Sequence, residues 1–385
     1  MFDTIILNIS QNSYQILQPE RFKPSANLLR GYGANGLKCV NNTTPAEEKI
    51  GIKRPRLTIT KRATNKGIEI PLKIEFSAPK LLFGTNVDEL EESDFKRVVI
   101  KLQSDLNAMG VATSEEAIMN AKVSALHPSK NIELKDGYTS SFVIKELHKI
   151  NLKKKLDLAK VTFRNDGQSL QMYAKRHQLV IYDKIADLSQ ANGRSIDGDQ
   201  PARQLSLFEA IQKIGKPMEI LRIEVRLAHK TKLGEVLKEI GYKESPSFQE
   251  IFKKDICQKI VKLYWEKMIA EENLFIFDLK GSPKKHLEEL LKANKKIKPK
   301  EAIYLVGLKA LCKEEGGTRE LRHLLKPICV DRTWYRIRDD TKKLNKKVKQ
   351  KQCHSWVAQV EEAIKIFASY KTEKLSTSPV NKSKV

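Results

Sequence analysis

Apolar and polar residues alternate along several short segments in the first 230 residues of the chain, as they do in β-strands that bury one face. The alternation predicts strands at Asp3–Ile9, Arg56–Thr60, Ile68–Phe76, Ile132–Lys135, Lys160–Arg164, Gln168–Tyr173, Gln178–Lys184 and Glu219–Leu227. Apolar residues at helical spacing predict helices from Ser93 to Gly110, over 141–150 and over 205–214. This mixture indicates an α+β fold with an antiparallel sheet.

The pattern changes after Lys230, where apolar residues recur every three or four positions almost to the end of the chain. Three of the predicted helices span 301–312, 318–325 and 332–344. The first of them is expected to pack with these side chains inward: Ile303, Val306, Ala310 and Leu311. The predicted organisation is an α+β domain at 1–230, a helical connector at 231–275, a basic helical domain at 276–370 and a disordered tail at 371–385.

Four of the predicted strands carry polar or charged side chains at every second position, between apolar ones. Because strand side chains have a period of two, each strand places its apolar set on one face and its polar set on the other. If the four strands join one sheet, its polar face collects Lys73, Glu75, Glu133, Lys135, Tyr182, Lys184, Arg222, Glu224 and Arg226. Such a face is either a solvated outer surface, as in many antiparallel sheets, or a surface that handles a ligand.

Two groups of residues on this face indicate phosphate chemistry. Arg222, Glu224 and Arg226 place a carboxylate between two guanidiniums, which suits a phosphate held beside a metal ligand. Tyr182 and Lys184 are two residues apart, so the ammonium would favour the phenolate of a side chain whose ordinary pKa is about 10. A phenolate can attack a phosphodiester, and the lysine would steady the charge on the phosphate.

Carboxylates on neighbouring strands suggest a divalent cation near this tyrosine. Mg²⁺ and Mn²⁺ prefer oxygen ligands, and either ion would polarise a scissile phosphate. The candidate ligands are Glu75, Glu133 and Glu224. His127 is a further candidate beside a predicted strand, although a lone histidine is more often an ordinary surface or core residue.

At these residues the sequence resembles the filamentous-phage gene II/X type of replication initiator, a branch of the rolling-circle initiators of phages and plasmids. The matching segments occur in the order LKIEFSAPKLLFGTN (72–86), HPSKNIEL (127–134), LVIYDKIADL (179–188) and ILRIEVRL (220–227). The resemblance implies a metal-dependent enzyme that nicks the replication origin in DNA and keeps a 5′-phosphotyrosine. It would leave a 3′-hydroxyl for the host replication machinery.

The resemblance also implies roles for individual residues. Tyr182 and Lys184 match the nucleophile and the lysine of the family's Y-x-K element. The family's R-x-E-x-R strand is matched by Arg222, Glu224 and Arg226.

The acidic positions match less completely. Glu75 matches the acidic residue of an I-E-x-x-x-S/P strand, and Glu133 falls where the family often has an aspartate. Many rolling-circle initiators also carry a His-hydrophobic-His metal motif, and this sequence has no such triplet, since His127 and His177 stand alone. The implied metal site therefore depends on the carboxylates.

Composition adds a polyanionic partner to this picture. The chain has 71 Lys and Arg against 47 Asp and Glu, a net charge of +24, and cationic side chains bind nucleic acid by releasing counterions from its phosphates. Residues 280–351 hold 22 Lys and Arg against 9 Asp and Glu, more than half of that net charge.

Two predicted helices in this basic region, separated by a turn that Pro327 and Asp331 frame, have the spacing of a helix-turn-helix or winged helix. The second helix would enter the major groove of DNA with Arg332, Arg336, Arg338 and Lys342. Trp334 is expected in the core of the domain. A charged helical bundle that binds nothing has the same spacing, and the concentration of charge favours DNA.

Other classes of protein fit the sequence less well. The five cysteines are far apart and form no C-x-x-C pair, which argues against a disulfide framework or structural zinc. No ATP phosphate loop, signal peptide or membrane-span pattern is found, so we expect a protein of the bacterial cytoplasm without a membrane partner. The alternatives are a non-enzymatic helix-turn-helix regulator of replication or transcription, and an RNA-binding protein, which the absence of an RNP-type aromatic strand disfavours.

Overall fold

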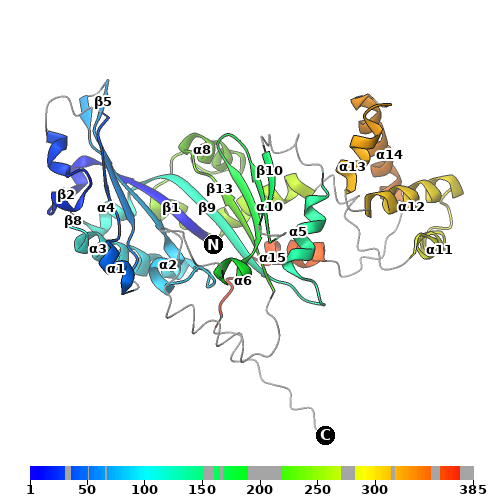
Figure 1. Cartoon of the computed structure of the whole chain (residues 1–385), viewed down its shortest axis with the longest axis horizontal. Helices are drawn as coiled ribbons and strands as arrows, with labels where there is room; N and C mark the ends of the chain where they lie inside the picture. The colour runs from blue at the N-terminus through cyan, green and yellow to red at the C-terminus, as the bar shows by residue number, and fades with distance from the viewer. Residues whose placement is uncertain are drawn as a thin grey trace, which may run out of the picture. The chain divides into compact units, whose positions relative to one another are not determined.

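The structure, a computed structural model (Figure 1), describes residues 1–30, 36–50, 52–65, 67–150, 160–164, 168–189, 219–269, 282–313, 317–328, 330–347 and 356–372. These residues form two compact units, of which the first draws on 1–133, 176–261 and 363–385 and the second on 134–175 and 262–362. The units do not follow the predicted linear division at residue 230, because helix α8 (Lys230–Glu239) packs against the sheet of the first unit.

The first unit is built on an antiparallel sheet, which confirms the expected α+β class. Its strands are β1 (Phe2–Ile9), β3 (Lys38–Asn41), β4 (Arg56–Thr60), β7 (Leu72–Ser77), β9 (Lys122–Glu133), β12 (Gln178–Asp183) and β13 (Ile220–Arg226). They lie in the order β12-β13-β9-β1-β7-β4-β3, and each is antiparallel to its neighbours. Two small ribbons are added, β2 (Tyr14–Ile16) with β8 (Val111–Thr113) and β5 (Arg62–Thr64) with β6 (Gly67–Glu69).

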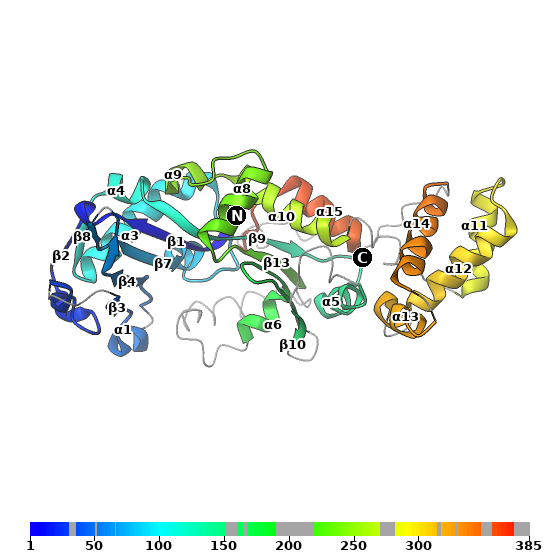
Figure 2. The same cartoon turned by 90° about the horizontal axis from the view of Figure 1, so that it is seen from above.

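Helices cover both faces of this sheet. They are α1 (Pro45–Lys49), α2 (Ala78–Phe83), α3 (Phe95–Ala108), α4 (Glu115–Met119), α6 (Lys184–Ser189), α8, α9 (Phe248–Ile251) and the first half of α10 (Lys254–Ile269), with short 3₁₀ turns at 11–13, 19–21, 26–30 and 92–94. Figure 2 shows α8 and α9 on one side of the sheet and α6 on the other.

Helix α3 illustrates how the sequence specifies these elements. Glu91 and Asp94 form a capping box ahead of it, and its Val98, Val99 and Leu102 are fully buried. Burying a side chain of this size contributes about 1.5–3 kcal/mol, so the apolar stripe fixes the helix on the sheet. The helix ends at Ala108, two residues before the predicted end at Gly110, whose φ of +75° suits a residue without a Cβ.

Strand β9 is much longer than the predicted strand at Ile132–Lys135. The pattern conceals this length because Pro128 has no N–H to donate to a strand ladder. In the structure Pro128 lies opposite Phe2 of β1, beside an irregularity in the register between the two strands. A bulge can accommodate a proline in this way, and it keeps His127 inside the sheet.

The polar face of the sheet is covered around β13. Leu221, Ile223 and Val225 are fully buried, but Arg222 and Glu224 on the opposite face are also only 1% and 2% exposed. Ile220, which shares a face with Arg222, packs in an apolar cluster with Val87 and with Leu188 of α6. The charged face that the sequence predicts at this strand is therefore part of the protein interior.

The second unit combines a β-hairpin with a set of helices. Its elements are α5 (Ser140–His148), β10 (Lys160–Arg164), β11 (Ser169–Tyr173), α11 (Pro283–Ala293), α12 (Pro299–Lys313), α13 (Gly317–Leu325) and α14 (Asp331–Lys347), and α15 (Trp356–Ile366) ends in the first unit. Leu290 of α11 and Ala302 and Leu305 of α12 form an apolar core. No helix in the described ranges is both long and apolar enough to cross a bilayer.

The inward face predicted for α12 is only partly right, because Val306 packs against the core of this unit but Ile303 and Leu311 do not. Ala302, Leu305 and Lys309 are buried, whereas Ile303 and Leu311 are 61% and 56% exposed. Apolar residues occur on both sides of this helix, so their spacing does not define a single buried face. The predicted helix at 205–214 lies outside the described residues.

Candidate functional site

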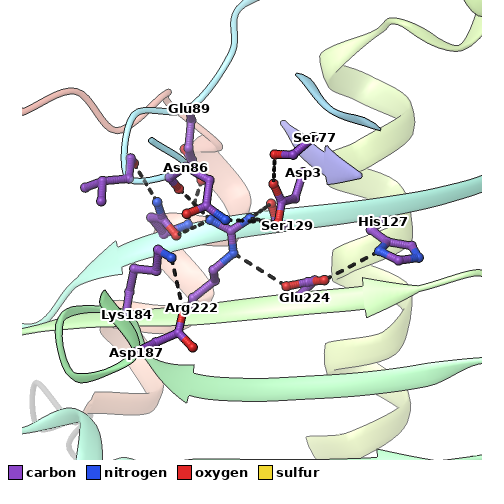
Figure 3. A network of polar contacts seen from close by, with 12 residues as sticks. Asp3, Ser77, Asn86, Glu89, His127, Ser129, Lys184, Asp187, Arg222 and Glu224 are labelled. Carbon is purple, nitrogen blue, oxygen red and sulfur yellow. Dashed lines mark hydrogen bonds and ion pairs between the residues drawn. The ribbon is translucent and has the colours of Figure 1, made fainter. Parts of the chain in front are cut away.

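Buried polar side chains form a network on the covered face of the sheet, with Arg222 at its centre (Figure 3). The Arg222 guanidinium donates to the Asn86 carbonyl oxygen at 2.7 Å and to Ser129 Oγ at 3.0 Å. It also donates to Asn131 Oδ1 at 3.3 Å and lies 3.3 Å from Asp3 Oδ2. Since the protein itself takes up these donors, Arg222 acts as a fixed positive charge and not as the exposed phosphate ligand that the sequence suggests.

Glu224 lies between two guanidiniums, as the R-x-E-x-R spacing predicts. Its Oε1 accepts a hydrogen bond from Arg226 Nε at 2.8 Å, and its Oε2 lies 3.7 Å from Arg222 Nε. Burial raises the pKa of this carboxyl, but Arg226 and Arg222 together lower it by a larger amount. The pKa therefore lies below its ordinary value. Glu224 therefore carries a negative charge at neutral pH although it is buried.

Tyr182 contacts this carboxylate directly. It lies opposite Arg222 in the pairing of β12 with β13, and its hydroxyl donates to Glu224 Oε2 at 3.3 Å. Burial raises the pKa of the phenol well above 10; Arg222 lowers it and Glu224 raises it further. The phenol is therefore neutral in the free protein, contrary to the expectation that a neighbouring lysine holds it as phenolate.

Lys184 is not on the strand. β12 ends at Asp183, whose Oδ1 accepts hydrogen bonds from two backbone N–H groups in the first turn of α6, both at 3.0 Å, and so caps the helix. Lys184 is the first residue of α6, and its Nζ lies 5.9 Å from the centroid of the Tyr182 ring and 3.2 Å from Asp187. The predicted placement of Lys184 and Tyr182 on one strand face is therefore wrong, although the two side chains are neighbours.

One edge of the network is accessible. His127 Nδ1 lies 3.6 Å from Glu224 Oε1, and the His127 and Arg226 side chains are 17% and 35% exposed. Burial lowers the pKa of His127 although Glu224 raises it, and the net direction is down, so the imidazole is neutral at neutral pH. A ligand can reach the network at these two residues.

The three predicted metal ligands do not come together. On β9 the residue opposite Glu224 is Ser129, and Glu133 lies four residues further along that strand. Four residues of strand separate the two positions by about 13 Å. Glu75 belongs to β7, and two strands lie between β7 and β13, which separates it from Glu224 by about 14 Å. Among the described residues no three His, Cys, Asp or Glu side chains converge as metal ligands. Glu224 and His127 are the donor pair that the fold brings together.

Several residues of the network have no counterpart in the sequence prediction. Asp3, Asn86, Ser129 and Asn131 surround Arg222. Burial raises the pKa of Asp3, but Arg222, two lysines and the hydrogen bond from Ser77 together lower it by more, so that carboxyl is ionised. A signal was present, because Asn86, Ser129 and Asn131 are polar residues within the segments that carry the family resemblance.

The predicted DNA-binding residues lie in the second unit, on α14. Trp334 is 4% exposed, which confirms its predicted place in the core, and Arg332 and Arg336 are exposed. Arg338 and Lys342 belong to the same helix, but the structure does not describe their side chains.

Comparisons with known proteins return no match. No family model matches the chain, and it is similar to no curated protein and to no solved structure. The resemblance to rolling-circle initiators therefore stays a prediction, and function has to be inferred from the residues of the site.

Proposed function

We propose that this protein is a rolling-circle DNA replication initiator that nicks and rejoins one strand at its origin through Tyr182. The observation that carries the proposal is the hydrogen bond from the Tyr182 hydroxyl to Glu224, beside Arg222 and Arg226. A nucleophile, a carboxylate base and fixed cations are the groups that transfer of a phosphodiester needs. The net charge of +24 supports a nucleic-acid substrate.

In the proposed reaction Tyr182 Oη attacks the scissile phosphorus while Glu224 takes the phenol proton. The bond from phosphorus to the 3′-oxygen breaks, this oxygen takes up one proton from water and leaves as a hydroxyl, and Glu224 returns the phenol proton to water. The 5′-phosphate stays on the tyrosine, and no net proton is consumed. In the rejoining step the 3′-hydroxyl attacks the phosphotyrosine, and the proton returns to Tyr182.

The two arginines have different parts in this proposal. Arg226 is one-third exposed and would stabilise the charge that develops on the phosphate. Arg222 is a positioning residue, because its hydrogen bonds to Asn86 and Ser129 fix it beside the tyrosine.

A divalent ion has no step assigned to it here. The carboxylates predicted to bind Mg²⁺ or Mn²⁺ are far apart, and both oxygens of Glu224 contact cationic side chains or Tyr182. The residues as they stand therefore do not fit the predicted metal site. The dependence of nicking on either ion is a separate measurement.

The experiment uses supercoiled plasmid that carries the protein's own gene region, with Mg²⁺, with Mn²⁺ or with a chelator. We expect nicked circles and a covalent protein–DNA adduct. Tyr182→Phe should abolish both and leave DNA affinity unchanged, whereas Tyr173→Phe on β11, a matched loss of one hydroxyl, should nick like the wild type. Nicking by Tyr182→Phe would place the nucleophile elsewhere.

A second candidate is a non-enzymatic DNA-binding regulator that acts through α13 and α14. The burial of Tyr182 and the exposure of Arg332 and Arg336 favour it. The two candidates differ in a single result, because binding of origin DNA without any adduct, under every ion tested, would support the regulator. Competition with an RNA of the same length separates both from an RNA-binding protein.

A further inference from the structure

The chain returns to the first unit after α15 and runs along the loop that precedes α3. We call residues 367–372 the strap and residues 84–91 the site loop. Glu89 N–H donates to the Tyr370 carbonyl oxygen at 2.9 Å, and Tyr370 N–H donates to Glu89 Oε2 at 3.0 Å. Thr372 N–H donates to Asp88 Oδ1 at 2.7 Å. Residues 371 and 372, which the sequence assigns to a disordered tail, are thus bound to the fold.

The turn into the strap is built for this path. Phe367 has a φ of +48°, a left-handed conformation that costs energy in a residue with a side chain. Its ring is buried, and Lys130 Nζ lies 5.8 Å from the ring centroid. Further along, Lys371 Nζ lies 4.4 Å from the Phe83 ring centroid. The strap is therefore held at both ends by side chains as well as by backbone hydrogen bonds.

The site loop contacts Arg222 and its neighbour Asn131. The Asn86 carbonyl oxygen accepts from Arg222 Nη1 at 2.7 Å, and the Val87 carbonyl oxygen accepts from Asn131 Nδ2 at 2.7 Å. Figure 3 shows Asn86 and Glu89 on the same side of the Arg222 guanidinium. The position of the site loop thus determines where Arg222 finds its acceptors.

Glu89 joins the strap, the site loop and β9. Its Oε2 accepts from Lys130 Nζ and its Oε1 from Asn131 N–H, both at 2.6 Å, in addition to the Tyr370 amide. Burial raises the pKa of Glu89, but Lys130 and the other donors together lower it by a larger amount, so the carboxylate is charged. The charged carboxylate holds these donors in one geometry.

Tyr370 also contacts the elements that carry the rest of the site. Its side chain packs against the cluster of Val87, Leu188 and Ile220, together with Ile185. Leu188 and Ile185 belong to α6, which begins at Lys184, and Ile220 begins β13. One side chain of the strap thus contacts the site loop, α6 and β13.

We propose that the strap is part of the site, and that Tyr370 and Glu89 are positioning residues for Arg222 and Tyr182. The catalytic consequence rests on the proposed nicking function, whereas the positioning itself does not. Loss of the strap removes the Tyr370 N–H donor from Glu89 and packing from the site loop, so Arg222 loses its fixed acceptors and the Tyr182–Glu224 contact loosens. Binding of DNA by the second unit does not require the strap.

Two truncations form a matched pair, since removal of 373–385 leaves the strap and removal of 367–385 deletes it. We expect the shorter deletion to behave like the full chain. The longer one should exchange the amide hydrogens of 84–91 and 129–132 about tenfold faster. It should also nick at least tenfold more slowly, with KM for DNA within twofold, and its Tyr182 ring resonances should move in NMR spectra.

Point variants keep the test valid if the longer deletion fails to fold. Tyr370→Ala should reproduce the faster exchange and the fall in kcat, and Tyr370→Phe, which retains the ring, should restore most of both. Equal exchange in the two truncations, or in Tyr370→Ala and the wild type, would overturn the proposal. If the wild type nicks no DNA, the proposed function fails, but exchange and the Tyr182 resonances still decide the role of the strap.

Discussion

Replacement of Glu224 by Gln tests whether the buried charges act as one network, because it keeps the shape of the side chain and removes its charge. The carboxylate accepts from Arg226 Nε at 2.8 Å and from the Tyr182 hydroxyl at 3.3 Å, and it lies 3.7 Å from Arg222 Nε. In the variant Arg222 retains Asp3, at 3.3 Å, and Arg226 loses its charged partner.

The cost follows from the burial of these groups. Removal of one partner of a buried ion pair destabilises a protein by about 3–5 kcal/mol. The charge of Asp3 still balances that of Arg222, and Arg226 is 35% exposed. We therefore expect Glu224→Gln to destabilise the protein by about 3 kcal/mol at pH 7, the lower end of this range. The pKa of Glu224 is below its ordinary 4.5 in the folded state, so its charge stabilises the fold above pH 4.5 and this contribution is lost as the pH falls through the folded-state pKa. The difference in the free energy of unfolding between wild type and Glu224→Gln should therefore become smaller in acid.

Amide hydrogen exchange of β12 and β13, at neutral and at acid pH, is the suitable assay. Tryptophan fluorescence is not, since Trp265, Trp334 and Trp356 all belong to the second unit. Glu235→Gln, which removes an exposed carboxylate on α8, is the matched control and should leave stability nearly unchanged, because solvent screens its ion pair with Lys232. If Glu224→Gln costs no more than this control, the residue is a surface charge and the reasoning is wrong.

Three further predictions concern the rest of the chain. Burial lowers the pKa of Lys309 to about 8, so Lys309→Met should stabilise the second unit by about 2–3 kcal/mol at pH 7 in thermal unfolding. The gain should shrink as the pH rises above about 8 and should vanish only well above the unfolded-state pKa of about 10.4; a gain independent of pH would refute this. Replacing Arg332 and Arg336 by Ala should weaken DNA binding about tenfold in a fluorescence titration and reduce its salt dependence, whereas unchanged affinity would remove α14 from the interface. Gly110→Ala should lower the unfolding temperature, since φ is +75° and the new Cβ would lie 2.5 Å from Gln18 Cβ; an unchanged midpoint would contradict the structure.

Local patterns predict the elements of this fold well. The predicted strands at 160–164 and 178–184 match β10 and β12 to within one residue, and the predicted helix from Ser93 contains α3. These elements carry strict alternation or a cap followed by an apolar stripe, which are signals within a few residues of one another. Pro128 removes such a signal from the middle of β9, so the alternation predicts a strand that is shorter than β9.

The candidate site is only partly predictable for a related reason. The spacing of Arg222, Glu224 and Arg226 places them on one face, and the structure brings Tyr182 to the same place. Alternation cannot tell a solvated polar face from a buried one, because both have a period of two. The cover at this face comes from α6, from the site loop and from the strap. The last two are at least 129 residues from β13 in the sequence.

The burial of this face gives the proposed reaction a sequence of charge changes that a solvated face would not have. Before the reaction Glu224 is negative, and its Oε1 accepts a hydrogen bond from Arg226 Nε at 2.8 Å. When Glu224 takes the proton of Tyr182, that pairing loses its ionic part, and the Arg226 guanidinium becomes available to the phosphate while the phosphate gains charge. Arg222 does not follow, because Asn86, Ser129 and Asp3 hold it in place. In this arrangement proton transfer to Glu224 and stabilisation of the phosphate by Arg226 are one event, so an arginine at position 226 is required in addition to the tyrosine and its base.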